Sequence, residues 1–294
     1  NNKAMAVKRL ELLKRKLRGD QAYKEKYAGV IEELIRTGQA EQVPTTQDTT
    51  LGEVWYIPHF GVVHPQKGKL RVVFDASAKY QNTSINDHLL TGPDQINSLL
   101  GILCRFRREP VAITCDIANM FYNFFVDKPD RDFFRFLWLD NEMNTVEHRM
   151  AVHLFGATSS PGVASFGLRT VAQKHMNDMP DAAKFVLQNV YVDDGITSVA
   201  SEREALELTQ NTTKTCASAN LRLHKFTSNS RVVLSQLPES EINKDLQGVD
   251  LFRDKLPTER TLGMEWCIET DSFRFINNLK VKPATRRGIL SMTS

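Results

Sequence analysis

The stretch Asn189-Val190-Tyr191-Val192-Asp193-Asp194-Gly195-Ile196-Thr197-Ser198-Val199 joins two β-prone runs through two adjacent carboxylates and a glycine. Valine, tyrosine and isoleucine favour strands, whereas Asp-Asp-Gly favours a tight turn. The pattern therefore predicts a β-hairpin that carries Asp193 and Asp194 at its tip. The alternative is a solvated turn, because aspartate and glycine are common turn residues.

A third carboxylate, Asp116, follows a short apolar run in Val111-Ala112-Ile113-Thr114-Cys115-Asp116-Ile117, which also predicts a strand. Two acids on a hairpin and one on a neighbouring strand would form an all-oxygen site for a pair of hard divalent cations. Mg²⁺ in such a site promotes in-line attack at a phosphorus centre. The three carboxylates therefore predict phosphoryl-transfer chemistry.

The composition is that of an ordinary globular protein, with 294 residues of which 41% are hydrophobic and 25% are charged. This length supports one large domain or two to three subdomains. We find no apolar run long enough to span a bilayer and no signal-peptide pattern, so we expect no membrane association. The four dispersed cysteines lack a zinc-site spacing and predict reduced thiols in the cytoplasm. The net charge of +3 permits nucleic-acid binding without requiring it.

The chain starts with Asn1-Asn2 rather than Met, and we expect it to be a piece of a longer polypeptide. Residues 3–37 have helical periodicity, with a break at Gly19-Asp20, and form the most basic part of the chain. Their charges indicate a solvated helix face or, alternatively, contact with a phosphate backbone. Residues 39–52 are polar and predict a linker.

Two β-rich segments within residues 55–75 flank a basic turn at Gly68, which predicts a hairpin. Lys67 and Lys69 lie at its tip and Arg71 lies just inside the second strand. One interpretation is a hairpin tip kept soluble by lysine. The other is a clamp on a triphosphate, because an arginine binds phosphate oxygens through two donors at once.

The remaining pattern alternates helices and strands. We expect helices over 95–105, from about 160 to 176 and over 202–220, strands over 133–139, 147–154, 221–226 and 231–234, and a small hairpin formed by 260–266 and 272–275. A loop of small and hydroxyl residues, 153–162, opens the second helix and would allow close approach of a ligand. The last residues, from Pro283, predict the start of another helix.

The order of these segments resembles that in the finger and palm regions of reverse transcriptases. The sequences of the motifs are most similar to those of the BEL/Pao class of long-terminal-repeat retrotransposons. The resemblance runs from about residue 50 to the end, and the first helices also resemble the lead-in of such polyproteins. It is carried by four ordered motifs: Leu70-Arg71-Val72-Val73-Phe74-Asp75-Ala76-Ser77, Cys115-Asp116-Ile117, Phe155-Gly156-Ala157-Thr158-Ser159-Ser160-Pro161 and Tyr191-Val192-Asp193-Asp194.

The resemblance implies an α+β right-hand polymerase with an antiparallel palm sheet, fingers and a partial thumb. Residues 1–50 would be a basic helical lead-in and linker, residues 51–235 the fingers and palm, and residues 236–294 a primer-grip-like hairpin and a truncated thumb start. The implied activity is that of an RNA-directed DNA polymerase, a nucleotidyltransferase that extends a primer on an RNA or DNA template with dNTPs. Protease, ribonuclease H and integrase would lie elsewhere on the parent polyprotein, and the expected location is the cytoplasm, including virus-like particles.

The resemblance also assigns roles to residues. Asp116, beside the backbone of Ile117, and Asp193 would hold two Mg²⁺ ions, or Mn²⁺ in their place, with Asp194 a less direct partner. The implied substrate contacts are Lys67, Lys69, Arg71, Asp75, Phe121, Phe155, Gly156, Tyr191 and Lys225, and the implied primer grip is Leu262, Gly263 and Met264. Among these, Phe121 would block a ribose 2′-hydroxyl and Lys225 would help the pyrophosphate to leave. Many retroviral relatives have Gln where this chain has Phe155, so a side-chain hydrogen bond to the nucleotide is not expected there.

Two other functions compete with a reverse transcriptase. One is a catalytically inactive or domesticated retroelement remnant that binds nucleic acid, and the intact Asp116, Asp193 and Asp194 argue against it. The other is an RNA-templated RNA polymerase, which Phe121 opposes.

Overall fold

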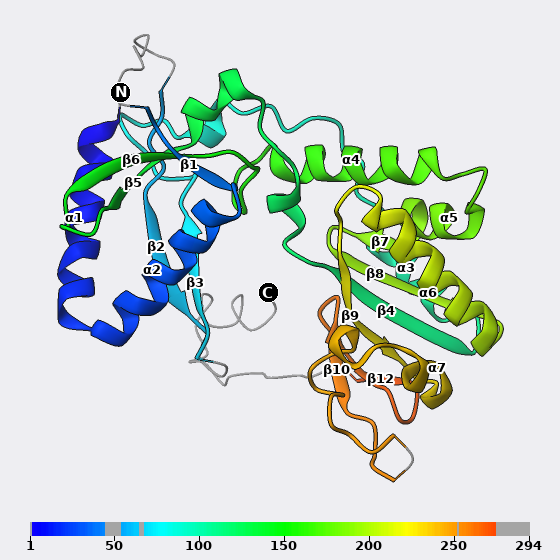
Figure 1. Cartoon of the computed structure of the whole chain (residues 1–294). Helices are drawn as coiled ribbons and strands as arrows, with labels where there is room; N and C mark the ends of the chain where they lie inside the picture. The colour runs from blue at the N-terminus through cyan, green and yellow to red at the C-terminus, as the bar shows by residue number, and fades with distance from the viewer. Residues whose placement is uncertain (1, 45–53, 65–67, 252, 275–294) are drawn as a thin grey trace, which may run out of the picture.

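The structure is a computed structural model that describes residues 2–44, 54–64, 68–251 and 253–274. It places the elements in two lobes with a small C-terminal sheet below the second lobe (Figure 1). No helix among the described residues has the length and apolar character needed to cross a bilayer.

The N-terminal lobe combines two helices with two small antiparallel sheets. One sheet has the order β1-β6-β5, and the other is the β2–β3 hairpin. Its elements are α1 (Lys3–Gly19), α2 (Gln21–Arg36), β1 (Ala40–Gln42), β2 (His59–Val63), β3 (Leu70–Phe74), β5 (Arg135–Leu139) and β6 (Thr145–Met150). One apolar core joins both helices to both sheets. The predicted helix break is confirmed, since Asp20 accepts a hydrogen bond from the Tyr23 N–H and caps α2.

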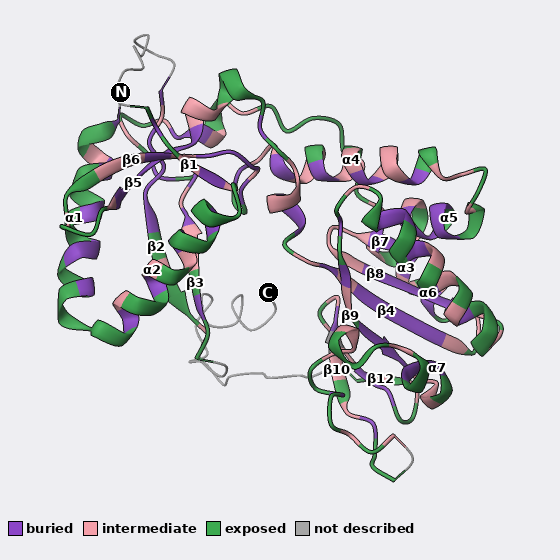
Figure 2. Cartoon of the chain, viewed as in Figure 1, coloured by how far each residue is buried: buried purple, intermediate pink, exposed green. Residues whose placement is uncertain are grey.

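The central lobe is built on an antiparallel sheet of order β7-β8-β4-β9. Its elements are α3 (Leu99–Phe106), β4 (Val111–Ile117), α4 (Ser160–Lys174), α5 (Pro180–Asn189), β7 (Val190–Tyr191), β8 (Asp194–Val199), α6 (Glu202–Ala217), β9 (Leu223–Ser228) and α7 (Arg231–Gln236). Apolar residues of α4, α5 and α6 pack on one face of the sheet, and those of α3 and the C-terminal sheet pack on the other, while α7 contributes a residue to each cluster. Because both faces are covered, β4 and β8 are almost continuously buried (Figure 2).

The edge strand β7 is only two residues long. Side chains of the α3 region cover this edge: Asn97 Nδ2 donates to the Val190 carbonyl (2.8 Å), and Arg105 Nε donates to Asn189 Oδ1 (2.6 Å). The β7–β8 hairpin is therefore held by these side-chain hydrogen bonds at its edge as well as by the pairing of β8 with β4.

Four expectations need correction. Within the predicted linker, β1 pairs with β6, with Ala40 opposite Met150. The segment 231–234, predicted as a strand, is the helix α7, because the Ser230 side chain caps it by accepting from the Val233 N–H (3.2 Å). The helix α5 was not predicted.

The fourth correction concerns the C-terminal sheet, which has three strands, β10 (Thr258–Thr261), β11 (Met264–Cys267) and β12 (Ser272–Arg274). The single strand predicted over 260–266 is broken by a turn at Leu262 and Gly263, whose φ angles are +48° and +81°. The predicted helix start at Pro283 lies outside the described residues.

Gly195 determines how closely the hairpin packs. A Cβ atom there would lie 2.8 Å from Cys115 Sγ and 2.8 Å from Phe185 Cζ, closer than real Cβ atoms come. Gly195 therefore lets β8 pack against β4 and α5 beside the two carboxylates.

We expect Gly195→Ala to lower the free energy of unfolding by about 1–3 kcal/mol, because overpacking forces neighbouring groups apart. Thermal melts should show this as a fall in melting temperature of several degrees. The matched control is Gly29→Ala on the exposed face of α2, where a Cβ meets nothing within 4 Å and the better helix former should be neutral or stabilising. Equal melting temperatures for Gly195→Ala and wild type would contradict the packing argument.

Candidate active site

The turn of the β7–β8 hairpin lies at Val192 and Asp193, and Tyr191 pairs with Asp194 across it. The two acids were predicted at the tip together, but Asp194 is the first residue of β8. Val192 has φ +55°, an unfavourable conformation for a β-branched residue. The hairpin holds this conformation because the Ile117 N–H donates to the Asp193 carbonyl (2.8 Å), which ties the turn to the end of β4.

The pairing of β4 with β8 brings the third carboxylate to the same place, since Asp116 lies directly opposite Asp194. Burial, followed by the charges of Asp193 and Asp116, raises the pKa of Asp194 to about 6. Burial and the charge of Asp116 also raise the pKa of Asp193. Both acids are partly buried, so the solvated turn considered above is not what the structure shows.

Asp116 itself is held by two neighbouring residues of β9. His224 Nε2 lies 2.9 Å from Asp116 Oδ1, and Lys225 Nζ donates to Asp116 Oδ2 at 2.5 Å. The Lys225 ammonium also lowers the pKa of Asp193 and of Asp194, against the larger raising effect of burial. His224 was not predicted as a site residue, because nothing in the sequence reveals that it lies opposite Asp116.

Three carboxylates within electrostatic reach match the oxygen donors and the charge that hard divalent cations require. The raised pKa values of Asp193 and Asp194 point the same way, because a cation would stabilise their ionised forms. Within the part of the chain that the structure describes, no group of three or more His, Cys, Asp or Glu side chains already converges on one point. The three carboxylates supply the oxygen donors that such ions need, but they do not converge as they stand, and Asp116 would have to exchange Lys225 for an ion.

Two predicted substrate-contacting residues come together as an aromatic pair. The Phe121 and Phe155 ring centroids lie 4.6 Å apart in an edge-on arrangement. Phe121 is 7% exposed and Phe155 is 46% exposed, so Phe155 presents the pair to solvent. The adjacent Gly156 has φ +94°, and its carbonyl accepts from Asn86 Nδ2 (2.9 Å), which fixes the loop.

The other predicted contacts are distributed over the two lobes. Lys69 and Arg71 are exposed on the β2–β3 hairpin, and Lys67 lies outside the described residues. Asp75 follows β3 and accepts from the Ser77 hydroxyl (2.7 Å). Tyr191 is half-buried and packs with the cluster that joins α3 to the C-terminal sheet.

The predicted primer-grip residues Leu262, Gly263 and Met264 form the tip of the β10–β11 hairpin. This hairpin and the central sheet enclose a polar cavity of about 500 Å³, which Asp116, Asp194, Lys225, Glu259, Thr261 and Glu265 line. The cavity therefore connects the carboxylates to the hairpin that carries the predicted grip. Glu259 was not predicted as part of this region.

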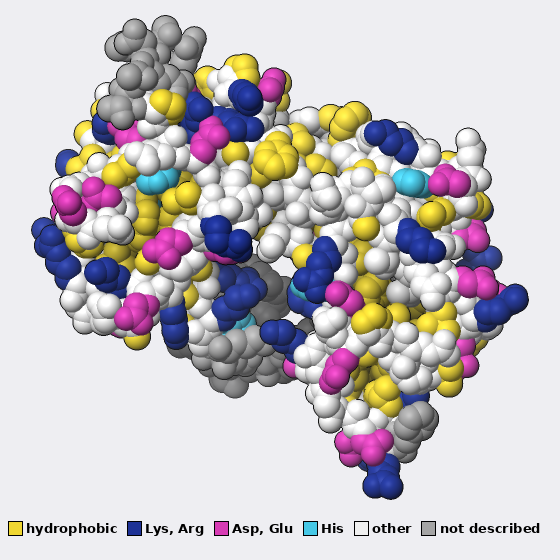
Figure 3. Space-filling view, viewed as in Figure 1, with side chains coloured by type: hydrophobic (Ala, Val, Ile, Leu, Met, Phe, Trp, Pro, Cys, Tyr) yellow, Lys and Arg dark blue, Asp and Glu magenta, His cyan; other side chains and the backbone are white. Residues whose placement is uncertain are grey.

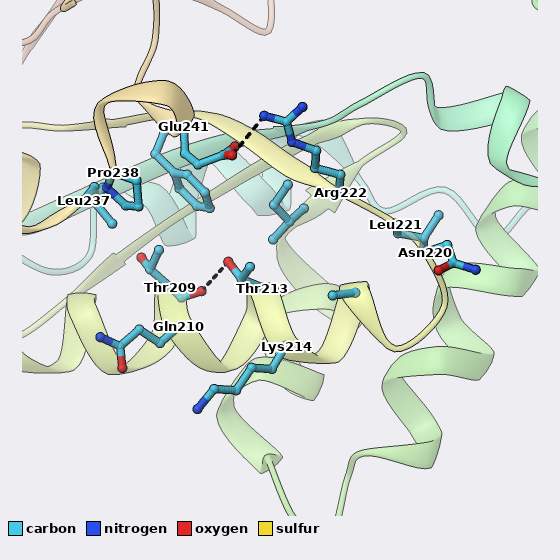
Figure 4. A pocket seen from close by; sticks show the side chains of 13 residues that line it. Thr209, Gln210, Thr213, Lys214, Asn220, Leu221, Arg222, Leu237, Pro238 and Glu241 are labelled. Carbon is cyan, nitrogen blue, oxygen red and sulfur yellow. Dashed lines mark hydrogen bonds and ion pairs between the residues drawn. The ribbon is translucent and has the colours of Figure 1, made fainter. Parts of the chain in front are cut away.

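A cavity of about 580 Å³ lies apart from the carboxylates, between α6, β9 and residues 237–241 (Figure 4). It is mainly apolar, and the Arg222–Glu241 ion pair (2.9 Å) crosses its rim. None of the predicted site residues lines it.

Solved foamy viral reverse transcriptase structures resemble this chain over most of its length. A foamy viral protease-reverse transcriptase in complex with double-stranded DNA matches with a TM-score of 0.61 and 18% identity, covering 92% of this chain and 39% of that one. A second such complex matches with a TM-score of 0.58 and 18% identity, covering 92% of this chain and 46% of that one. The prototype foamy virus protease-reverse transcriptase matches with a TM-score of 0.53 and 20% identity, covering 80% of this chain and 27% of that one.

The chain has a reverse transcriptase fold. It spans less than half the length of these similar proteins. No family model and no curated protein matches the sequence. The predicted fold class, α+β with antiparallel sheets, is confirmed, whereas the site residues stay predictions.

Glu259 gives this reverse transcriptase fold a pH-dependent stability. Burial raises its pKa to about 7, partly offset by hydrogen bonds to its carboxylate, including one from Asn243 Nδ2 (3.0 Å). The folded state therefore holds the proton more tightly than the unfolded state between about pH 4.5 and pH 7. The contribution of Glu259 to stability is lost as the pH rises through that window.

We expect Glu259→Gln, which is neutral at every pH, to be more stable than wild type at pH 8 by about 1–2 kcal/mol. The difference should vanish near pH 4, where Glu259 is protonated in both states. Chemical denaturation at the two pH values measures it, with Glu32→Gln on the exposed face of α2 as the control. A pH-independent difference would show that Glu259 does not carry this effect.

Proposed function

We propose that this chain is the reverse transcriptase domain of a BEL/Pao-type retroelement polyprotein and extends a primer with dNTPs on an RNA or DNA template. The observation that carries the proposal is the register of β4 and β8, which places Asp116 opposite Asp194 while the Asp193 backbone is tied to Ile117. This arrangement brings Asp116 together with the adjacent acids Asp193 and Asp194, from two distant parts of the sequence, at one end of a buried sheet. The reverse transcriptase fold supports the same assignment.

A nucleic-acid partner is supported by charge. Lys and Arg side chains lie on both sides of the hollow between the two lobes (Figure 3). Cations on facing walls suit the phosphate backbone of a duplex, which supplies much of the affinity in such complexes. Two of the similar foamy viral structures are complexes with double-stranded DNA.

In the proposed reaction, Asp116, Asp193 and Asp194 would hold Mg²⁺, with Mn²⁺ as a substitute. The ions, when bound, would activate the primer 3′-hydroxyl and neutralise charge on the triphosphate. Lys69 and Arg71 would bind phosphate oxygens from the β2–β3 hairpin. The β10–β11 tip would position the primer end beside the carboxylates.

The aromatic pair would select the sugar. A deoxyribose would pack on the Phe121–Phe155 surface, whereas a 2′-hydroxyl would have to push into it. Because Phe155 backs Phe121 at a ring distance of 4.6 Å, Phe121 has little room to yield in that direction.

A non-catalytic nucleic-acid binder is the second candidate. It is favoured by the occupation of both Asp116 oxygens by His224 and Lys225. A primer-extension assay with Mg²⁺ present and then chelated separates the two. Metal-dependent extension supports the polymerase, and duplex binding without any extension supports the binder.

We expect Asp193→Asn to abolish most primer extension while retaining the fold, because the change removes charge with little change of size. Burial and the Asp116 charge raise the pKa of Asp193, so losing its charge should not destabilise the protein. The control is Asp181→Asn at an exposed position on α5, which should extend primers as wild type does. Near wild-type extension by folded Asp193→Asn would eliminate Asp193 as a catalytic ligand.

We expect Phe121→Val to accept rNTPs about 5- to 150-fold better relative to dNTPs, since overpacking against the ring costs about 1–3 kcal/mol. Single-nucleotide incorporation with each sugar measures the ratio. Phe166→Val, at a 62% exposed position on α4, is the control and should leave the ratio unchanged. An unchanged ratio in well-folded Phe121→Val would mean that Phe121 is a core residue only.

A further inference from the structure

His224 and Lys225 are consecutive residues of β9, yet both contact the carboxylate of Asp116. In a regular strand, consecutive side chains point to opposite faces of the sheet. The contacts are made possible by an irregularity in the pairing of β4 with β9. Thr114 lies opposite Thr227 and Asp116 lies opposite His224, so Lys225 and Phe226 together face Cys115.

This extra residue is a β-bulge, and Lys225 adopts φ +55° within it. A left-handed conformation is unfavourable for lysine, and bulges next to active sites commonly redirect a side chain. The bulge turns Lys225 toward the face on which Asp116 and Asp194 line the polar cavity. The local backbone strain is thus tied to one contact, the ion pair between Lys225 and Asp116.

The two contacts differ in how easily they can be given up. The His224 side chain is 25% exposed and short, whereas the Lys225 side chain is 49% exposed and ends a flexible four-carbon stem. Lys225 can therefore leave Asp116 Oδ2 by side-chain rotation alone, while His224 keeps Oδ1 oriented. An oxygen that accepts from an ammonium group at 2.5 Å has no room for a divalent cation at the same position.

We propose that Lys225 is a built-in counter-cation that occupies Asp116 Oδ2 and competes with the divalent cation for it. This inference rests on the proposed function only in taking Asp116 as a metal ligand. Without metal, Lys225 offsets part of the negative charge of the three carboxylates. When a triphosphate arrives, its oxygens offer the ammonium another partner, so nucleotide binding would favour loading of the ion on Asp116.

The test measures Mn²⁺ affinity directly, from the loss of the free-ion signal in electron paramagnetic resonance, with the full chain and without nucleotide. Lys225→Met keeps the stem and removes the charge. Lys225→Asn also removes the charge and tolerates the positive φ better, which guards against a folding defect in the first variant. Lys184→Met, which removes an equal charge at an exposed position on α5, is the matched control.

We expect both Lys225 variants to bind Mn²⁺ about 2- to 5-fold more tightly than wild type, the scale of one lost ion pair. Lys184→Met should match wild type, and Asp116→Asn should remove the gain when combined with Lys225→Met. Unchanged or weaker Mn²⁺ binding in both folded Lys225 variants would overturn the proposal. Primer extension is measured separately. If the Lys225 variants bind Mn²⁺ more tightly but the chain extends no primer, the proposed polymerase activity is rejected and the inference about Lys225 is retained.

Discussion

Burial of Asp193 and Asp194 beside Asp116 is the constraint on which the rest of the structure depends. Burial first, and the neighbouring carboxylate charges second, disfavour the ionised forms of Asp193 and Asp194, and they raise the pKa of Asp194 to about 6. The surrounding fold has to hold these two acids in place against both effects. Helices on both faces of the sheet, the bulge of β9 and the covered edge of β7 each restrain the strands that carry the acids.

The features that sequence reasoning predicted well are local. The β-prone runs on either side of Asp193 and Asp194 identify the hairpin, although its turn lies at Val192 and Asp193 rather than at Asp-Asp-Gly. The apolar run before Asp116 is long enough to identify a strand. The break between the first two helices is likewise read from one capping residue, Asp20. In each case the residues that determine the structure are neighbours in sequence, so a short window contains the physical cause.

The features that were missed depend on partners far away in sequence. Three residues from Ala40 form a strand only because β6 offers them an edge. Val232 and Val233 favour a strand by propensity, yet the cap from Ser230 and the burial of Val233 and Leu234 make this segment helical. His224 lies opposite Asp116 only because the β-bulge shifts the pairing of β9 with β4 by one residue, and no sequence pattern predicts this bulge.

The short, covered edge of the central sheet has a consequence for the behaviour of the protein in a crowded cell. An exposed strand edge invites pairing with another chain and can start aggregation. β7 offers only two residues, and Asn97 already binds the Val190 carbonyl. Another molecule therefore finds almost no free backbone to pair with beside the hairpin, so the carboxylates can lie at this end of the sheet without making its edge prone to aggregation.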